Sequence, residues 1–281
     1  MDPNSQTGQY SVLMSVYAKE KSEYLRAAME SIWNQSVKTD DFVLVCDGPL
    51  TAGLDAVIEQ SEKEHPELTV VRLEKNLGLG RALNHGIKYC KNELIARMDS
   101  DDISRSDRCE RQLEIFRKNP DICICSGTVE EFSKSINRIT SRKVVPEKQN
   151  EIMAFAKKRN PFNHPCVMYK KSAVEEAGGY QDFFLLEDFY LWIRMLQKGD
   201  VGYNIQQPLL WMRTGSKLYL RRSGWKYTMS QLRLLKYMKD TKFISFTQYL
   251  LDVMVRVQFS LLPNNIRKFL YRNILRKIRS H

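Results

Sequence analysis

Residues 93–102 of the 281-residue chain read ELIARMDSDD, and this stretch decides the fold that we expect. After its first residue it is apolar, apart from Arg97, until it ends in the acids Asp99, Asp101 and Asp102. A short apolar run of this kind is typical of a buried strand. The acids therefore follow the carboxyl end of a strand, which is where ligands bind in open α/β sheets.

The spacing of these acids indicates a cation site. Carboxylates packed so closely repel one another unless a cation or hydrogen-bond donors hold them. Divalent metals prefer oxygen ligands and often share them with the phosphates of a substrate. The alternative is a solvated acidic turn in which Asp102 or Ser104 caps the next helix.

The rest of the chain predicts an α/β fold with a mostly parallel central sheet. Apolar strand patterns alternate with helical patterns at roughly 30-residue intervals, as expected for parallel strands joined by right-handed crossovers. After the acids we expect a helix over 104–117, with Ser104 and Asp107 as a capping box, and then a polar connection over 133–147. The other expected strands cover 10–17, 42–46, 68–73, 122–132 and 203–212, and the other expected helices cover 21–36, 54–64, 81–90, 147–158 and 185–199.

Polar side chains end three of these strands. Ser15 and Tyr17 lie at the exit of the first strand, Asp47 follows the second, and Asp99 follows the fourth. Because the carboxyl ends of parallel strands meet at one edge of the sheet, these residues suit a nucleotide site. The chain has neither the glycine-rich dinucleotide fingerprint after the first strand nor a Walker A motif, which disfavours a hydride-transfer enzyme and a P-loop NTPase.

A second acidic pair, Glu187 and Asp188, stands at the beginning of a predicted helix. The helix dipole there favours a carboxylate over a protonated acid. The alternative for Asp188 is a structural role as a helix cap or first-turn acid.

Composition indicates a globular protein of a reducing compartment. Six cysteines occur without a paired CxxC spacing, and we expect them to be reduced thiols in the cytoplasm. The polar N-terminus lacks the apolar region of a signal peptide, and no run of about 18 apolar residues suggests a membrane span.

The net charge of +11 is concentrated in the C-terminal part of the chain. Residues 213–281 hold 16 Lys and Arg against two acids. We expect a main domain over 1–222 and a basic amphipathic helical extension over 223–281 that lies at an anionic membrane surface. Packing on the body and a homodimer contact are the alternatives, and nucleic-acid binding is disfavoured because no base-reading motif accompanies the charge.

Six motifs, in this order, resemble the family 2 glycosyltransferases, which have the GT-A fold. They are SVLMSVY, VCDGP, NLGLGRALNHGI, MDSDD, NHPCVMYKKSAVEEAGGY and LEDFYLWIRMLQKG, and the resemblance covers residues 10 to about 213. The chain is most similar to bacterial enzymes that build capsule, exopolysaccharide or O-antigen units, including amylovoran-type transferases. The motifs depart from the family pattern at Cys46, Pro49 and Ser106, none of which touches the expected chemistry.

The resemblance implies a role for each matching residue. Asp188 matches the catalytic base, with Glu187 as the alternative base. Asp101 and Asp99 match the DxD metal ligands, with Asp99 also near the ribose. The residues that match the nucleotide site are Ser15, Tyr17, Asp47, Arg81 and Asp99, and His164 matches the acceptor region.

Several of these residues also have a simpler structural interpretation. Asp47 is alternatively a turn residue before Gly48. His164 is alternatively a buried, hydrogen-bonded histidine, and Arg81 is alternatively a solvated arginine at the start of a helix.

The implied activity is inverting transfer of a hexose (galactose, glucose or an N-acetyl form) from a UDP-sugar, with Mn²⁺ or Mg²⁺. The implied acceptor is a lipid-diphosphate-linked saccharide at the inner face of the cell membrane, and the product is a β-linkage. The alternatives are another nucleotide sugar, a soluble acceptor, or a membrane-associated protein that binds a nucleotide sugar without turnover.

Overall fold

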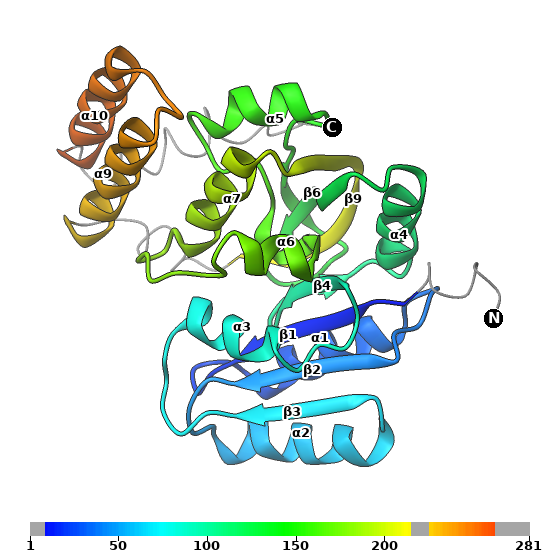
Figure 1. Cartoon of the computed structure of the whole chain (residues 1–281). Coiled ribbons are helices and arrows are strands. Elements are labelled where there is room, and N and C mark those ends of the chain that lie inside the picture. Colours follow the sequence, from blue (N-terminus) through cyan, green and yellow to red (C-terminus); the bar gives the residue numbers. More distant parts are fainter. Residues whose placement is uncertain (1–8, 215–224, 262–281) are drawn as a thin grey trace.

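The computed structural model of the protein describes residues 9–214 and 225–261, and helices flank both faces of a nine-stranded sheet (Figure 1). The strands are β1 (Ser11–Val16), β2 (Asp41–Cys46), β3 (Leu68–Arg72), β4 (Leu94–Asp99), β5 (Ile103–Ser104), β6 (Ile122–Phe132), β7 (Ile139–Lys143), β8 (Met168–Lys170) and β9 (Val201–Arg213). Their order is β3-β2-β1-β4-β8-β6-β9-β5, and β7 pairs with β6. The expected α/β class is confirmed.

The first half of the sheet is parallel. Strands β3, β2, β1 and β4 pair in parallel with one another. In β2, Phe42 and Leu44 pack into the core on one face of the sheet, and Val43 and Val45 pack into the core on the other. Burial on both faces explains why these strands read as continuous apolar runs.

The second half of the sheet is mixed. Strand β8 is antiparallel to both β4 and β6, whereas β6 and β9 are parallel. The short β5 pairs antiparallel with the far end of β9. Because β4 leads directly into β5, this pairing brings the end of β9 next to the acids that follow β4.

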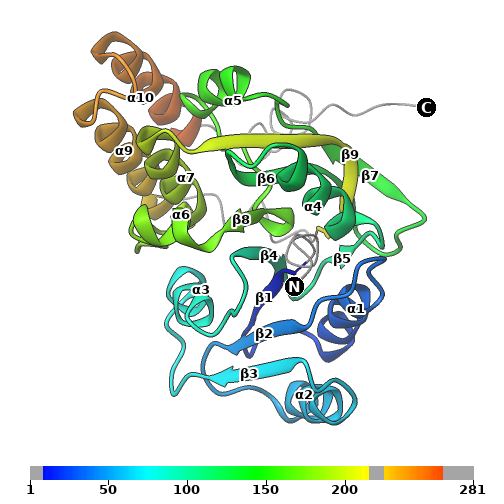
Figure 2. The same cartoon turned by 45° about the vertical axis from the view of Figure 1, so that its right-hand side comes forward.

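The helices form a layer on each face of the sheet (Figure 2). Helices α1 (Ser22–Trp33), α2 (Ala52–Glu64) and α4 (Arg108–Lys118) contribute to the core on one face. Helices α3 (Leu79–Ile87), α5 (Gln149–Ala156), α6 (Lys171–Glu176) and α7 (Glu187–Lys198) contribute to the core on the other face.

The prediction for residues 104–117 was wrong at its beginning. Helix α4 begins at Arg108, because Ile103 and Ser104 pair with β9 as β5. Ser104 is buried and receives a hydrogen bond from the Gln35 side chain (3.2 Å), so it does not cap the helix. Asp107 stands at the N-cap position but makes no capping hydrogen bond.

Two short elements were not predicted. Strand β7 lies within the stretch expected to be a polar connection, and α6 follows β8 directly. Both are too short for their periodicity to stand out in the sequence, and β7 depends on its pairing with β6.

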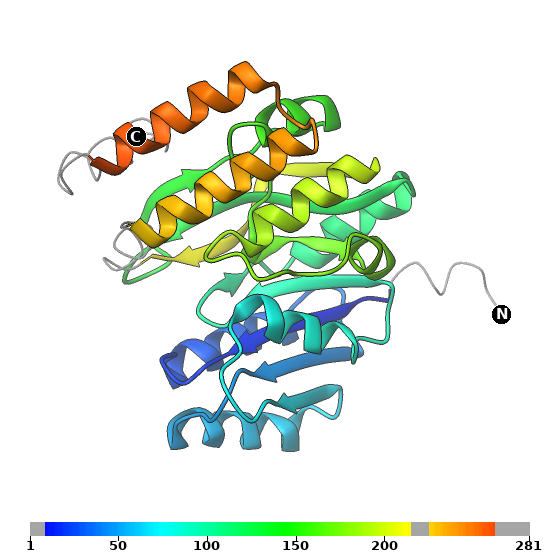
Figure 3. The ribbon, with the colours of Figure 1, turned by 60° about the vertical axis from the view of Figure 1, so that its left-hand side comes forward.

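The C-terminal helices form an antiparallel pair beside α7 (Figure 3). Helix α9 (Trp225–Asp240) buries Leu234, Leu235 and Met238 in the same core as α7, and α10 (Phe246–Leu261) follows it. None of the helices in the described ranges is long and apolar enough to cross a membrane. The predicted boundary at 222 and the part of the predicted helical extension after residue 261 lie outside the described residues.

Candidate active site

A cleft of about 1510 Å³ lies at the carboxyl ends of β1, β2 and β4. Its other walls come from the beginning of α7, the segment 142–160, and the pair α9 and α10. Every residue that the sequence analysis singled out for the site lines this cleft: Ser15, Tyr17, Asp47, Arg81, Asp99, Asp101, His164, Glu187 and Asp188. The structure therefore brings together residues that are up to about 170 positions apart, as expected for strand ends that share an edge.

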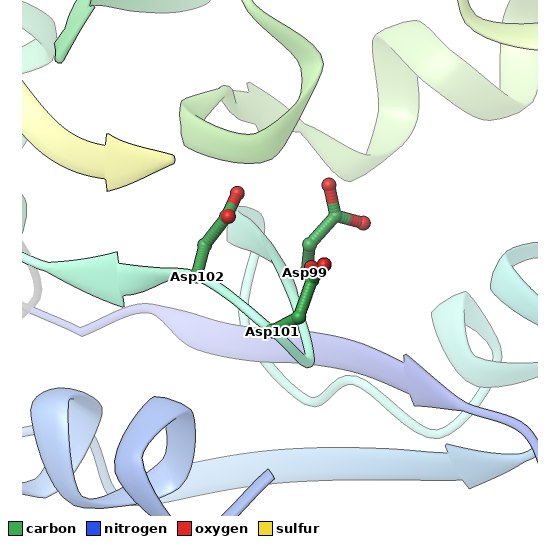
Figure 4. A group of neighbouring side chains, drawn as sticks. All are labelled: Asp99, Asp101 and Asp102. Carbon is green, nitrogen blue, oxygen red and sulfur yellow. The ribbon is translucent and has the colours of Figure 1, made fainter. Parts of the chain in front are cut away.

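The acidic cluster comes from the end of β4 and the turn that follows it (Figure 4). One carboxylate oxygen from each of Asp99, Asp101 and Asp102 lies within 4.8 Å of the other two. Burial, followed by the charges of Asp99 and Glu20, raises the pKa of Asp101 to about 7. Three acids held this close resist ionisation, which is the electrostatic condition that a cation would relieve.

Asp102 belongs to this cluster, as the spacing of the three acids predicts, although the resemblance implies metal ligation only for Asp99 and Asp101. Its side chain is 1% exposed, and Oδ1 accepts a hydrogen bond from the backbone N–H of Arg213 at 2.7 Å. Within the described residues, Oδ2 has no hydrogen-bond partner. The alternative role of Asp102, as the cap of the next helix, is not observed, because α4 begins at Arg108.

In the sequence, Arg97 is the one charged residue within the apolar run of β4. Its side chain is 1% exposed and makes an ion pair with Asp99. Within the described part of the chain, its Nε and Nη1 have no hydrogen-bond partner. A buried guanidinium thus lies directly under an acidic cluster, where it offsets part of the negative charge.

Asp47 holds the loop that follows β3. Its carboxylate accepts hydrogen bonds from the backbone N–H groups of Leu77 (2.7 Å) and Gly78 (3.0 Å). The neighbouring Gly48 has a φ of 86°, and a Cβ atom there would lie 2.6 Å from the backbone nitrogen of Asn76. The hydrogen bonds of Asp47 thus fit the turn-forming interpretation. Asp47 also lines the cleft, and its contact with a nucleotide stays a prediction.

Glu187 and Asp188 occupy the first turn of α7, where the helix dipole favours negative charge. Asp188 Oδ2 accepts a hydrogen bond from Asn160 Nδ2 at 2.7 Å, and Oδ1 accepts one from the backbone N–H of Phe189 at 2.7 Å. Burial, followed by the charge of Asp188, raises the pKa of Glu187 to about 7. The contact with Asn160 was not predicted, because it joins residues 28 positions apart across the cleft.

His164 and Arg81 each contact another side chain of the protein. The ring Nε2 of His164 lies 2.9 Å from the Tyr180 hydroxyl, and burial, followed by the charge of Arg97, lowers the pKa of His164 well below its usual value. The imidazole is therefore neutral at physiological pH. Arg81 lies exposed at the cleft mouth and pairs with Asp182 at 3.3 Å.

Ser15 and Tyr17 lie at the exit of β1. Ser15 is aligned with Asp99 in the pairing of β1 with β4, so the two side chains stand beside each other at the cleft edge. Tyr17 is 38% exposed, so its ring is accessible from the cleft. The role of both residues in a base pocket stays a prediction.

The chain matches the sequence family described as glycosyl transferase family 2 over residues 11–178. It is 37% identical to a UDP-Gal:alpha-D-GlcNAc-diphosphoundecaprenol beta-1,3-galactosyltransferase of Escherichia coli, over 96% of this chain and 98% of that protein. It is 38% identical to the amylovoran biosynthesis glycosyltransferase AmsE of Erwinia amylovora, over 93% of this chain and 97% of that protein.

Solved structures show the same fold at low identity. The structure of S. aureus TarS 1–349 in complex with UDP-GlcNAc aligns with a TM-score of 0.66 at 13% identity, over 95% of this chain and 76% of that chain. The mannosyltransferase PcManGT from Pyrobaculum calidifontis, in complex with GDP-Man and Mn²⁺, aligns with a TM-score of 0.62 at 15% identity, over 92% and 71% of the two chains.

Proposed function

The chain belongs to family 2 of the glycosyltransferases, and we propose that it moves a hexose from a UDP-sugar to a lipid-diphosphate-linked saccharide with inversion at the anomeric carbon. The hexose is galactose, glucose or an N-acetyl form, and the product is a β-linked unit of a bacterial surface polysaccharide. The activity for which the E. coli relative is named supports the donor class, the acceptor class and the β-linkage. The observation that carries the proposal is that Asp188 and the acidic cluster line one cleft.

The acidic cluster fits a divalent cation. All its donors are carboxylate oxygens, the buried Oδ2 of Asp102 has no partner among the described residues, and the pKa of Asp101 is raised to about 7 by burial and like charge. Asp99 and Asp101 would hold Mn²⁺ or Mg²⁺, in keeping with the preference of these ions for oxygen ligands. A bound cation there would supply charge stabilisation for a departing diphosphate, a contribution of several kcal/mol.

Asp188 would act as the general base. Asn160 and the backbone N–H of Phe189 each donate to one of its oxygens, which orients the carboxylate in the cleft wall. In the reaction, the acceptor hydroxyl gives its proton to Asp188 while its oxygen bonds to the anomeric carbon. The bond from that carbon to the diphosphate oxygen breaks, and UDP leaves with the electron pair. General-base assistance of this kind contributes about 10² to 10⁴ in rate.

The proposed acceptor indicates the location of the enzyme in the cell. A lipid-linked acceptor would lie in the cytoplasmic leaflet, so we expect a cytoplasmic protein attached peripherally to the inner face of the membrane. The basic C-terminal part of the chain, with 16 Lys and Arg against two acids after residue 212, supports attraction to anionic lipid.

A donor screen tests the proposal. Purified protein with Mn²⁺ and a lipid-diphosphate GlcNAc acceptor should release UDP from one UDP-sugar, and NMR of the product should show a β-anomer. Asp101→Ala should remove this activity, whereas Glu114→Gln, at an exposed acid on α4, should retain it. Binding of a UDP-sugar without any UDP release would instead support a non-catalytic binding protein.

A further inference from the structure

Helix α10 has its apolar side turned outward. Five of its apolar side chains are between 49% and 63% exposed, and we call them the outer face of α10: Phe246, Leu250, Leu251, Met254 and Val255. Their spacing places them on one side of the helix. The charged residues Asp252 and Arg256 instead line the cleft. A surface helix of a protein in water normally turns its charged side outward and its apolar side inward, so α10 has the reverse arrangement.

Contacts on the inner side of α10 hold this orientation. Tyr249 and Val253 pack against the core that α7 and α9 share. Arg256 donates a hydrogen bond to the backbone carbonyl of Lys158, just beyond the end of α5, at 3.2 Å. The helix is thus attached to the catalytic body while its outer face stays exposed.

Further apolar side chains are exposed on the neighbouring helix α9. Figure 3 shows that the beginning of α9 lies beside the end of α10. Trp225 and Met229, at the beginning of α9, are 72% and 45% exposed, and Lys226 lies next to Trp225 in the chain. Tryptophan beside lysine is typical of the boundary between water and a bilayer.

The cleft wall next to α10 is basic. Among the described residues, segment 142–160 and α10 give the cleft six basic and three acidic side chains, and we call the six the basic wall: Arg142, Lys143, Lys157, Lys158, Arg159 and Arg256. The rest of the lining has eight acidic and three basic side chains. The lining of the cleft therefore has a mainly acidic part and a mainly basic part.

We propose that the outer face of α10 inserts into the surface of an anionic bilayer, and that the basic wall binds the diphosphate of a lipid anchored in that leaflet. This inference rests on the proposed function, whose acceptor it places in the cleft. Apolar side chains would contact the acyl region, and the diphosphate would lie just above it. Residues 262–281, which follow α10, add six Lys and Arg and no acid in the sequence, which strengthens attraction to anionic head groups.

Vesicle binding tests the outer face. Full-length protein is mixed with vesicles of phosphatidylcholine and phosphatidylglycerol, and the bound fraction is measured by sedimentation. Leu250→Glu/Met254→Glu should lower the partition coefficient by about tenfold or more, because it puts two charges into an apolar contact. Leu251→Ala/Val255→Ala should lower it by less, and the matched control Tyr89→Glu, at a residue that is 52% exposed after α3, should bind as the wild type does.

Equal vesicle binding by the wild type and by both α10 variants would overturn the proposal. So would a wild-type dimer that the glutamate variant dissociates without any change in vesicle binding, because α10 would then contact a second copy of the chain. Unfolding midpoints of all variants should stay close to that of the wild type, since the changed residues are exposed.

Acceptor kinetics test the basic wall. Lys157→Glu/Lys158→Glu should raise the KM for a vesicle-borne lipid-diphosphate acceptor by about tenfold. The KM for the donor should not change, because neither lysine is among the residues expected to hold the nucleotide or the cation. Lys88→Glu is the control for charge at a remote exposed site.

An unchanged acceptor KM would refute the assignment of the basic wall. Absence of UDP release from the wild type would refute the proposed function and leave the vesicle result to decide the role of α10.

Discussion

Replacing Asp101 with asparagine should stabilise the cation-free protein and, at the same time, remove its response to Mn²⁺. The carboxylate oxygens of Asp99, Asp101 and Asp102 lie within 4.8 Å of one another. Two unit charges at this separation repel by about 3 kcal/mol at an effective dielectric constant of about 20. Burial, together with this repulsion, raises the pKa of Asp101 from 3.8 to about 7.

The raised pKa of Asp101 sets the size and the sign of the effect. A rise from 3.8 to about 7 corresponds to about 4 kcal/mol of folding stability lost when the carboxyl is ionised. Solvent screening of this partly exposed side chain reduces the figure to about 2 kcal/mol. The native state keeps its proton below about pH 7 and the unfolded state loses it near pH 4, so the loss grows over this interval and is complete above it.

Urea unfolding in EDTA measures this effect. At about pH 8, Asp101→Asn should raise the free energy of unfolding by about 2 kcal/mol, and at about pH 5 by less than half as much. Mn²⁺ at 100 times its Kd should stabilise the wild type by about 2.7 kcal/mol and the variant far less. A variant that is less stable than the wild type in EDTA, or that Mn²⁺ stabilises equally, would refute the electrostatic account. Glu114→Gln should match the wild type in both measurements.

Three further predictions follow from the cleft. Asp188→Asn should lower kcat by about 10² to 10⁴ with little change in the donor KM, and a larger loss in Glu187→Gln would assign the base to Glu187 instead. The pKa of Glu187 is raised to about 7, chiefly by burial, so its carboxylate forms above that pH. A plot of kcat/KM against pH should therefore rise through about pH 7, and the plot for Glu187→Gln should lack this rise. Asp47→Ala should lower the free energy of unfolding by about 1–3 kcal/mol, because the backbone N–H groups of Leu77 and Gly78 lose their acceptor; a rise in donor KM without this loss of stability would instead favour a direct nucleotide contact.

The strand ends are the part of the site that sequence patterns locate best. Apolar runs followed by Ser15, Asp47 and Asp99 predicted parallel strands that end at one edge, and all three residues line the cleft. The prediction succeeds because a buried parallel strand needs apolar residues on both faces, and the chain direction alone determines which end carries the polar residue. Neither condition depends on long-range contacts.

Elements that depend on a distant partner were not predictable in this way. Ser104 belongs to β5 because it pairs with Leu210, which overrides the local helix-capping pattern. The orientation of Asp188 depends on Asn160, and the apolar residues of α10 are exposed because Asp252 and Arg256 face the cleft.

The sequence by itself thus determined the α/β class, the family and the residues that gather at the sheet edge. The tertiary structure alone decided how each carboxylate is held, that Arg97 lies beneath the acids, and that the cleft has an acidic and a basic side. The physical reason is that burial and hydrogen bonding act over a few ångströms, and charge interactions over about 10 Å at physiological ionic strength, so they depend on neighbours in space that no local pattern of residues specifies.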